Sequence, residues 1–267
     1  MSLKRVAAVM LRQFYLMRGS FSRVSPLFAW VAIDMLLWGF MTRYLNSLTV
    51  STFNFVPMLL GAVLLWDFFV RVMQGVSMAF FEDVWSRNFL NIFATPISIS
   101  EYVSGLVLCS IVTSSVSLLM MMAVATAVFG LSFLAYGWMV IPFLMVLFLF
   151  GIALGVFACA VVLRLGPAAE WFIWPMPALL SPFAGVFYPL STLPRWMQVF
   201  AHFLPPAYVF EGLRAVISGG VASKTGLVQG GLLAVLYCLL ACRLFSWVYR
   251  QAVRTGLIAR YSAETVS

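Results

Sequence analysis

Few residues of this sequence could take part in chemistry, and they are scattered along the chain. The sequence contains 8 aspartates and glutamates and 1 histidine. Transfer or hydrolysis needs paired carboxylates, a histidine-based constellation or a metal cluster at one place. On the predicted outer side the only such residues are Glu211 and His202, and the carboxylates of the predicted inner side lie within the 82–96 segment or alone. The sequence therefore predicts no catalytic residue, no metal site and no cofactor in this chain.

Charged residues inside long apolar runs are the more informative candidates. They are Asp34, Asp67, Arg71 and Glu170. A charge at the centre of a bilayer costs about 2.5 kcal/mol or more, so each needs a partner or water. Asp67 and Arg71 are four residues apart, and the favoured interpretation is a structural ion pair on one helical face or an Arg71 side chain that extends to the membrane interface. Asp34 has no local partner, which leaves a contact with another span, such as Arg71, or a polar cavity.

Glu170 follows an apolar run that ends near Arg164. It could face a substrate entrance, or it could simply mark the membrane interface. Both interpretations stay open.

The composition is that of a membrane protein. Hydrophobic residues make up 64% of the chain and charged residues 9%, and the mean hydropathy is +1.05. A soluble domain carries roughly 25% charged residues. Because a membrane span needs about 20 mostly apolar residues, the 267 residues can hold about six spans with short connections. We expect an all-α membrane protein with six transmembrane helices, forming a single transmembrane domain over residues 1–267.

The predicted spans follow the apolar runs. They cover about 26–42, about 55–80, a pair between Glu101 and Arg164 with a turn at 130–137, about 168–188, and about 225–248. The fifth contains Pro175, Pro177 and Pro182, which free backbone groups that lipid cannot satisfy. It is therefore predicted to be kinked and packed against other protein.

The charge bias predicts the orientation. Of the 16 lysines and arginines, most fall on the side that would be cytoplasmic. That side holds Lys4, Arg5, Arg12, Arg18, Arg23, Arg71, Arg87, Arg164, Arg243, Arg250, Arg254 and Arg260. The other side holds Arg43, Arg195, Arg214 and Lys224. We expect both termini to be cytoplasmic, in the inner membrane, and the net charge of +8 to reflect orientation and not binding to nucleic acid.

Gly151 and Gly155 are one helical turn apart within the predicted fourth span. Small residues at this spacing let two helices approach closely. The pattern fits packing within one chain at least as well as a seam between two copies.

Three segments are predicted to lie at membrane surfaces. Residues 3–17 have an apolar face with Leu3, Val6, Ala7, Met10, Phe14 and Met17, and an opposite face with Lys4, Arg5 and Arg12. Such a helix lies in the plane of the interface, with its basic side toward anionic headgroups. The alternative is the basic flank of the first span.

Residues 82–96 form a short polar segment between two apolar runs. A helix starting near Glu82 would place its two acids in the first turn, where the helix dipole favours negative charge, and Pro96 would end it. The segment is too short and too polar to span, so we expect a soluble partner to bind it at the membrane surface. The predicted contact residues are Glu82, Asp83, Trp85, Arg87, Asn88, Phe89 and Asn91.

Residues 189–224 are too interrupted by proline to span and too apolar for an ordinary loop. Leu193, Trp196, Met197, Phe200 and Phe203 form one helical stripe, and Val209, Phe210, Leu213 and Val216 form another. Two short helices dipping into the outer leaflet, with the break at Pro205-Pro206, fit this pattern. Glu211 and Arg214, three apart, are expected to form an ordinary pair on a helix surface.

Three local patterns recur in one known family. They are the 82–96 segment ending in Thr95-Pro96-Ile97-Ser98, the motif Leu193-Pro194-x-Trp196, and Leu204-Pro205-Pro206-x-Tyr208-x-x-Glu211-Gly212-Leu213-Arg214. With them, nearly the whole chain resembles the permease subunits of ABC-2 type exporters. The resemblance implies a dimer that pairs with two copies of an ATP-binding cassette ATPase. It also implies that 82–96 is the coupling helix, on the cytoplasmic side between spans two and three.

The chain has no nucleotide site of its own by sequence. The nearest look-alike to a phosphate-binding loop has serine at Ser218 and Ser223, where the motif needs glycine for the backbone amides to close on phosphate. ATP and magnesium are therefore expected in the partner subunit.

Two other functional classes stay open. One is a membrane-embedded lipid-linked transferase, and the other is an ion-coupled secondary transporter that uses Asp34 and Asp67. The sequence does not name the cargo. A lipid, a lipid-linked glycan, an amphipathic small molecule, or force transmission without cargo are all compatible with it.

Overall fold

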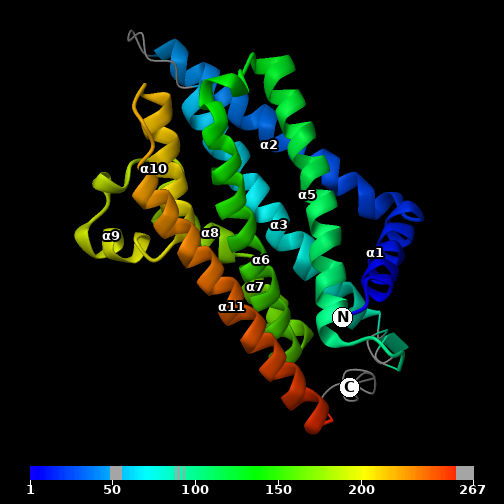
Figure 1. Cartoon of the computed structure of the whole chain (residues 1–267). Coiled ribbons are helices and arrows are strands. Elements are labelled where there is room, and N and C mark those ends of the chain that lie inside the picture. The colour runs from blue at the N-terminus through cyan, green and yellow to red at the C-terminus, as the bar shows by residue number, and fades with distance from the viewer. Residues whose placement is uncertain (49–55, 87, 89–90, 93, 257–267) are drawn as a thin grey trace.

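The computed structural model describes residues 1–48, 56–86, 88, 91, 92 and 94–256, and its regular structure there is helical (Figure 1). The all-α class is thus confirmed for these residues. The α-helices are α1 (Leu3–Arg18), α2 (Phe21–Leu48), α3 (Gly61–Trp85), α5 (Ile99–Phe129), α6 (Val140–Leu165), α7 (Glu170–Ile173), α8 (Met176–Ala184), α9 (Arg195–Ala201), α10 (Pro205–Ile217) and α11 (Lys224–Arg254).

Four helical segments in the described part of the chain are long and apolar enough to cross a membrane. They are Val56–Trp85, Ile99–Phe129, Tyr136–Leu165 and Lys224–Arg254. These match the predicted second, third, fourth and sixth spans. The predicted first span lies within α2, a continuous helix of 28 residues that is not among the four. The six-span topology therefore stays a prediction.

The predicted fifth span is not one helix. α7 has four residues and ends before Pro175, and α8 has nine residues and includes Pro182. At about 1.5 Å per residue neither approaches the ~30 Å of a bilayer core. The prolines thus interrupt this segment more completely than the expected kink, because each removes a backbone donor and clashes with the preceding turn.

α3 is the central helix of the fold. It lies between α5 and α6, while α11 runs along the outer side of α6 and α1 packs beside α5 (Figure 1). The buried side chains form two clusters, one around Phe69 and Phe143 and one around Phe80 and Phe245. α3 contributes to both, so it joins the two parts of the core.

Glycines set how closely α3 approaches its neighbours. A Cβ at Gly151 would lie 2.8 Å from the side chain of Val72, and a Cβ at Gly155 would lie 2.8 Å from the backbone oxygen of Met73. The spacing of small residues in α6 therefore serves packing within one chain, against α3. On the other side of α3, a Cβ at Gly75 would lie 2.6 Å from Ser110 Oγ of α5.

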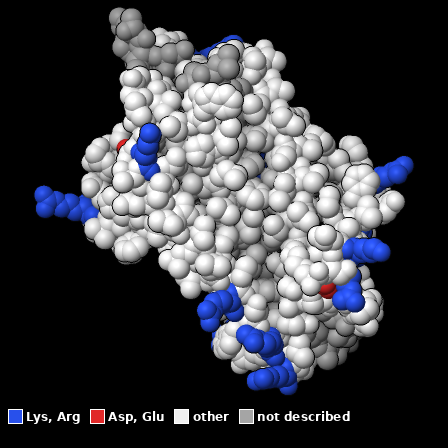
Figure 2. Space-filling view, viewed as in Figure 1, with Lys and Arg blue, Asp and Glu red and all other residues white. Residues whose placement is uncertain are grey.

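On the face of the molecule that Figure 2 shows, surface charge lies at the ends and edges. Figure 2 shows lysine and arginine atoms over the lower end of α11, over α1 and over the side that carries α9, around an almost uncharged middle. α11 exposes Leu232, Leu236, Leu239 and Leu240 in this middle region. An uncharged apolar band flanked by basic residues is typical of a membrane protein.

α1 forms as predicted, but its buried face differs from the predicted apolar face. Val6, Val9 and Gln13 are buried, whereas Leu3 and Phe14 are exposed. The prediction followed hydrophobicity alone, and α1 instead turns toward α5, where polar contacts at both of its ends fix its rotation.

The two short helices α9 and α10 meet at the predicted break. α10 begins at Pro205, and prolines are tolerated in a first turn because those amides have no partner within the helix. Val209, Phe210 and Leu213 are buried, as the stripe predicted. The membrane side on which this pair lies stays a prediction.

The expected pair of Glu211 and Arg214 is formed, but Arg214 is buried, so it is not an ordinary surface pair. Arg214 is only 9% exposed. Its guanidinium donates to Gly185 O at 2.6 Å and to Glu211 Oε1 at 2.8 Å, and Glu211 Oε1 also accepts from Leu190 N. The pair fixes the chain after α8 onto α10, because Gly185 has a left-handed conformation (φ 62°) whose carbonyl needs a donor.

We predict that Gly155→Ala lowers the stability of the fold. The added methyl group meets backbone at Met73, which cannot rotate away, so we expect a loss of about 1–3 kcal/mol in the free energy of unfolding. Gly231→Ala is the matched control, because its Cβ would meet nothing closer than 3.9 Å. Thermal unfolding in detergent measures both, and equal midpoints for the two variants would contradict the close contact of α3 with α6.

Candidate functional site: a polar cavity beside a buried carboxylate

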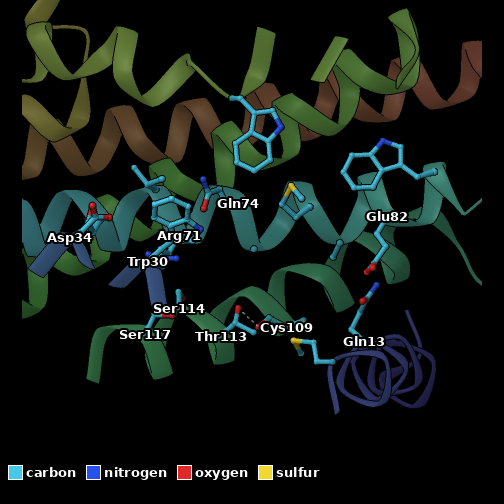
Figure 3. A pocket seen from close by; sticks show the side chains of 18 residues that line it. Gln13, Trp30, Asp34, Arg71, Gln74, Glu82, Cys109, Thr113, Ser114 and Ser117 are labelled. Atoms are coloured by element: carbon cyan, nitrogen blue, oxygen red, sulfur yellow. Dashed lines mark hydrogen bonds between the residues drawn. The ribbon is translucent and has the colours of Figure 1, made fainter. Parts of the chain in front are cut away.

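A cavity of about 710 Å³ lies between α1, α2, α3 and α5 (Figure 3). In the close-up, Asp34, Trp30 and Arg71 lie toward one end and Gln13 and Glu82 toward the other. The walls contain both polar and aromatic side chains. They are Gln13, Met17, Trp30, Asp34, Asp67, Val70, Arg71, Gln74, Gly75, Met78, Ala79, Glu82, Trp85, Cys109, Thr113, Ser114, Ser117 and Trp174.

One face of α3 supplies the charged wall. Positions 67, 71, 74, 78, 82 and 85 recur every three or four residues, which places them on one side of a helix. The opposite side of α3 packs on α6 through Val72, Met73 and Val76. The same helix therefore has a packed face and, from Asp67 to Trp85, a cavity face.

α5 supplies a row of small polar side chains. Cys109, Thr113 and Ser117 are spaced by four residues, and Ser114 lies beside them. Thr113 Oγ1 donates to Cys109 O at 3.1 Å, and Ser114 Oγ donates to Ser110 O at 2.6 Å. Since these hydroxyl protons are used within α5, the oxygens remain as acceptors toward the cavity.

A hydrogen bond between helices holds the two walls together. Ser110 Oγ of α5 donates to Val72 O of α3 at 2.9 Å, next to Gly75, where the helices touch. This contact lies behind the cavity and sets the distance between its α3 and α5 walls.

The expected ion pair of Asp67 with Arg71 is not formed. Within the described residues, no ion pair of 4.0 Å or less joins either side chain to an opposite charge, and Asp67 Oδ2 and Arg71 Nε are buried without a hydrogen-bond partner. Asp34 also lines the cavity and makes no such pair. The structure therefore places Asp34, Asp67 and Arg71 around one polar space, and a polar cavity was one of the two alternatives for Asp34.

At the end of the cavity, Asp83 is bound by two other helices. Its carboxylate is 1% exposed. The guanidinium of Arg12 in α1 donates to both Asp83 oxygens, with Nη1–Oδ2 at 2.9 Å, and Tyr102 of α5 donates its hydroxyl to Oδ2 at 2.7 Å. The hydrogen bond to Asp83 raises the pKa of the Arg12 guanidinium, so Arg12 stays ionised. We call Asp83, Arg12 and Tyr102 the carboxylate clamp.

Glu101 fixes the beginning of α1 in a similar way. Its carboxylate accepts from the backbone N of Ser2 at 2.6 Å and from the backbone N of Ser98 at 3.0 Å, and Arg5 lies at 3.5 Å. Ser98 and Glu101 also form a capping box at the start of α5. α1 is thus attached to α5 at its start through Glu101 and to α3 through the clamp.

The structure corrects the predicted 82–96 helix in two respects. α3 continues to Trp85, so Glu82 and Asp83 belong to the last turns of α3 and not to the first turn of a new helix. Asp83 is buried in the clamp and cannot be a surface contact for a partner. The apolar periodicity of 61–81 simply continues through these acids, because Arg12 neutralises the buried one.

The structure says less about the remaining residues of the predicted contact with the partner. Arg87 and Phe89 lie outside the described residues. Trp85 and Asn91 are exposed, and Asn91 Nδ2 donates to Asn88 Oδ1 at 3.2 Å. Their role as a docking surface stays a prediction.

The other predicted site residues are separate from the cavity. Glu170 begins α7, with Oε2 buried and lacking a hydrogen-bond partner in the described chain. Pro194, Trp196, Pro205, Pro206, Tyr208, Glu211 and Arg214 all lie in α9, α10 or their boundaries. There Tyr208 donates its hydroxyl to His202 O at 2.9 Å, so the motif shapes this helix pair.

Sequence reasoning missed several lining residues. Gln13 and Gln74 carry no charge and gave no signal. The row at Cys109, Thr113 and Ser117 was detectable, because polar residues recur there every four positions in an apolar run. Arg12 was predicted to face lipid headgroups, whereas its partner is Asp83.

We predict that Arg12→Gln destabilises the fold. It leaves the buried Asp83 carboxylate without its counter-charge, which costs about 3–5 kcal/mol for a fully buried pair. We expect about 2–4 kcal/mol because Arg12 is 30% exposed. Adding Asp83→Asn should recover part of the loss, since the unpaired charge is then gone.

Arg5→Gln is the control for the clamp variant. Arg5 is 45% exposed and 3.5 Å from Glu101, so its removal should cost less than about 1 kcal/mol. Unfolding of the unchanged chain, of Arg12→Gln, of Asp83→Asn and of the double variant in detergent gives the coupling energy of Arg12 with Asp83. Additive losses in the double variant would show that the two side chains do not depend on each other.

Comparison with known families identifies the fold. The model of the family described as ABC-2 type transporter matches residues 5–218, which run from α1 to the end of α10. No curated protein gave a significant match. Members of this family are transmembrane permease components that work with an ABC ATPase, and the four apolar spans agree with a multi-pass membrane location. The chain therefore belongs to the ABC-2 type transporter family, as its membrane domain.

Proposed function

We propose that this chain is the permease subunit of an ATP-driven exporter. It moves an amphipathic molecule, of lipid, lipid-linked glycan or small-molecule type, from the cytoplasmic side outward. The observation that carries the proposal is the position of α3. This helix lines the cavity from Asp67 to Trp85 and leads directly into residues 86–98.

The geometry supports coupling through α3. An ATPase bound at residues 86–96 would push or pull the end of α3 and, through the carboxylate clamp, α1 as well. Ser110 and the glycines of α6 hold α3 tightly along its other face. A tightly packed helix transmits displacement because a packed core does not deform continuously. The cavity walls would then move apart or together with the ATPase.

The assembly we propose has two copies of this chain and two copies of the ATPase, with ATP and magnesium bound in the ATPase. Both termini lie in the cytoplasm, and the membrane is the inner membrane. The basic residues over α1 and the end of α11 support this orientation (Figure 2). Trp30 and Leu37 beside Asp34 are 60% and 58% exposed. A second copy or lipid could cover this side of the cavity.

An ion-coupled transporter is the second candidate, because two carboxylates, Asp34 and Asp67, line the cavity. Family membership favours the first candidate. Dependence of transport on ATP, measured in vesicles with the ion gradients collapsed, discriminates between them.

We predict that residue 91 lies against the ATPase. In a chain with the exposed Cys242 replaced by serine, Asn91→Cys should crosslink to the co-purified ATPase subunit through a short thiol–amine reagent. Ser223→Cys, which is equally exposed but begins α11 at the other end of the molecule, is the control. The product is detected as a band of the summed mass on a denaturing gel.

One outcome of the crosslinking experiment would contradict the proposed docking site. Crosslinking at residue 223 with none at 91, in a complex that hydrolyses ATP, would remove the docking assignment.

We predict that α9 and its flanks lie outside the cell. In the same background, Ser191→Cys should react with a membrane-impermeant thiol reagent added to intact cells. Ser86→Cys, exposed at the end of α3, should react only after the membrane is opened. The reverse pattern would invert the proposed orientation.

A further inference from the structure

The cavity between α1, α2, α3 and α5 contains more negative than positive side chains at its Asp34 end. We propose that it takes a hydrophobic organic cation, a molecule with an apolar body and one positive charge, with Asp34 as its counter-charge. This inference rests on the proposed function, because it names the cargo class of the same cavity.

The charged side chains around Arg71 are two carboxylates, Asp34 and Asp67. Asp34 and Asp67 both interact electrostatically with Arg71 and with each other. One guanidinium balances one carboxylate, which leaves a second carboxylate that needs either a proton or another cation. Charge inside the membrane is costly unless it is paired or hydrated. A cationic ligand would restore neutrality, whereas an anionic ligand would meet two carboxylates for one arginine.

Tryptophan side chains line the cavity beside these charges. Trp30 precedes Asp34 by four residues on the same side of α2, and both line the cavity. Trp85 and Trp174 line it elsewhere. Indole faces attract cations, most strongly where water is excluded, and their apolar bodies pack against a hydrophobic ligand. Tryptophan beside an excess carboxylate fits an organic cation better than an inorganic one, which needs oxygen ligands.

Unpaired polar atoms in the cavity wall distinguish a ligand site from a gap in the packing. Gln13 and Ser117 are 3% and 1% exposed, and Gln13 Nε2 and Ser117 Oγ have no hydrogen-bond partner among the described residues. Buried polar atoms are nearly always paired, so unpaired ones lining a cavity indicate a missing partner. A volume of about 710 Å³ lies within the usual range of roughly 300–1,000 Å³ for ligand pockets.

The test compares two probes of the same shape and opposite charge. The full chain is reconstituted in nanodiscs of neutral lipid, and equilibrium dialysis measures binding of tetraphenylphosphonium and of tetraphenylborate. Protein-free nanodiscs give the amount that partitions into lipid. We expect saturable binding of tetraphenylphosphonium, at least about tenfold tighter than that of tetraphenylborate, because charge interactions are strong where water is excluded.

Variants of opposite sign make the test specific. Asp34→Asn keeps the shape of the side chain and should weaken tetraphenylphosphonium binding at least about tenfold. Arg71→Gln removes the competing cation and should strengthen it. Glu211→Gln is the matched control, since it makes the same carboxylate-to-amide change outside the cavity and should leave binding unchanged. Thermal unfolding confirms that each variant is folded before its binding is compared.

Three outcomes overturn the inference. They are no saturable binding of tetraphenylphosphonium, equal or tighter binding of tetraphenylborate, and binding that Asp34→Asn and Arg71→Gln shift in the same direction. None of these involves the ATPase. A failed crosslink at residue 91 with intact cation binding would instead refute the proposed coupling, so the two failures are distinguishable.

Discussion

The buried carboxylate of Asp83 is the interaction on which the arrangement of the helices around the cavity depends. Without Arg12 and Tyr102, this charge at the end of α3 would have to move toward water, and α3 could not end where it does. The clamp also holds α1 against α3, and α1 closes one end of the cavity with Gln13 and Met17. One ionic contact therefore determines both where α3 ends and how the cavity is closed.

The rest of α3 shows how a polar space can exist within an apolar bundle. The face that packs on α6 meets Gly151 and Gly155 so closely that no side chain fits between the two helices. This dense packing contributes dispersion energy that can offset the cost of the polar face. The opposite face carries Asp67 and Arg71 and faces the cavity.

Among the described residues, Asp34, Asp67 and Arg71 form no ion-pair contact with one another, and that agrees with a transport protein better than with a structural core. Buried ion pairs that serve only the fold would be in contact, because an unpaired buried charge is strongly destabilising. Here Asp67 Oδ2 and Arg71 Nε have no hydrogen-bond partner among the described residues. Polar groups without contacts of their own stay available to a bound molecule, and the family implies an ABC ATPase as the partner of this chain.

The sequence by itself determined the helices. Uninterrupted apolar runs marked α3, α5, α6 and α11, and the prolines marked the break at Pro205 and the interrupted segment before α8. These signals are local, because burial repeats along a helix with its own period. Only the tertiary structure decided which polar residues meet. Arg12 and Asp83 are 71 positions apart, and Asp34 and Arg71 lie on different helices. No periodicity encodes such partners, because they depend on how helices pack and on which buried charge must be neutralised.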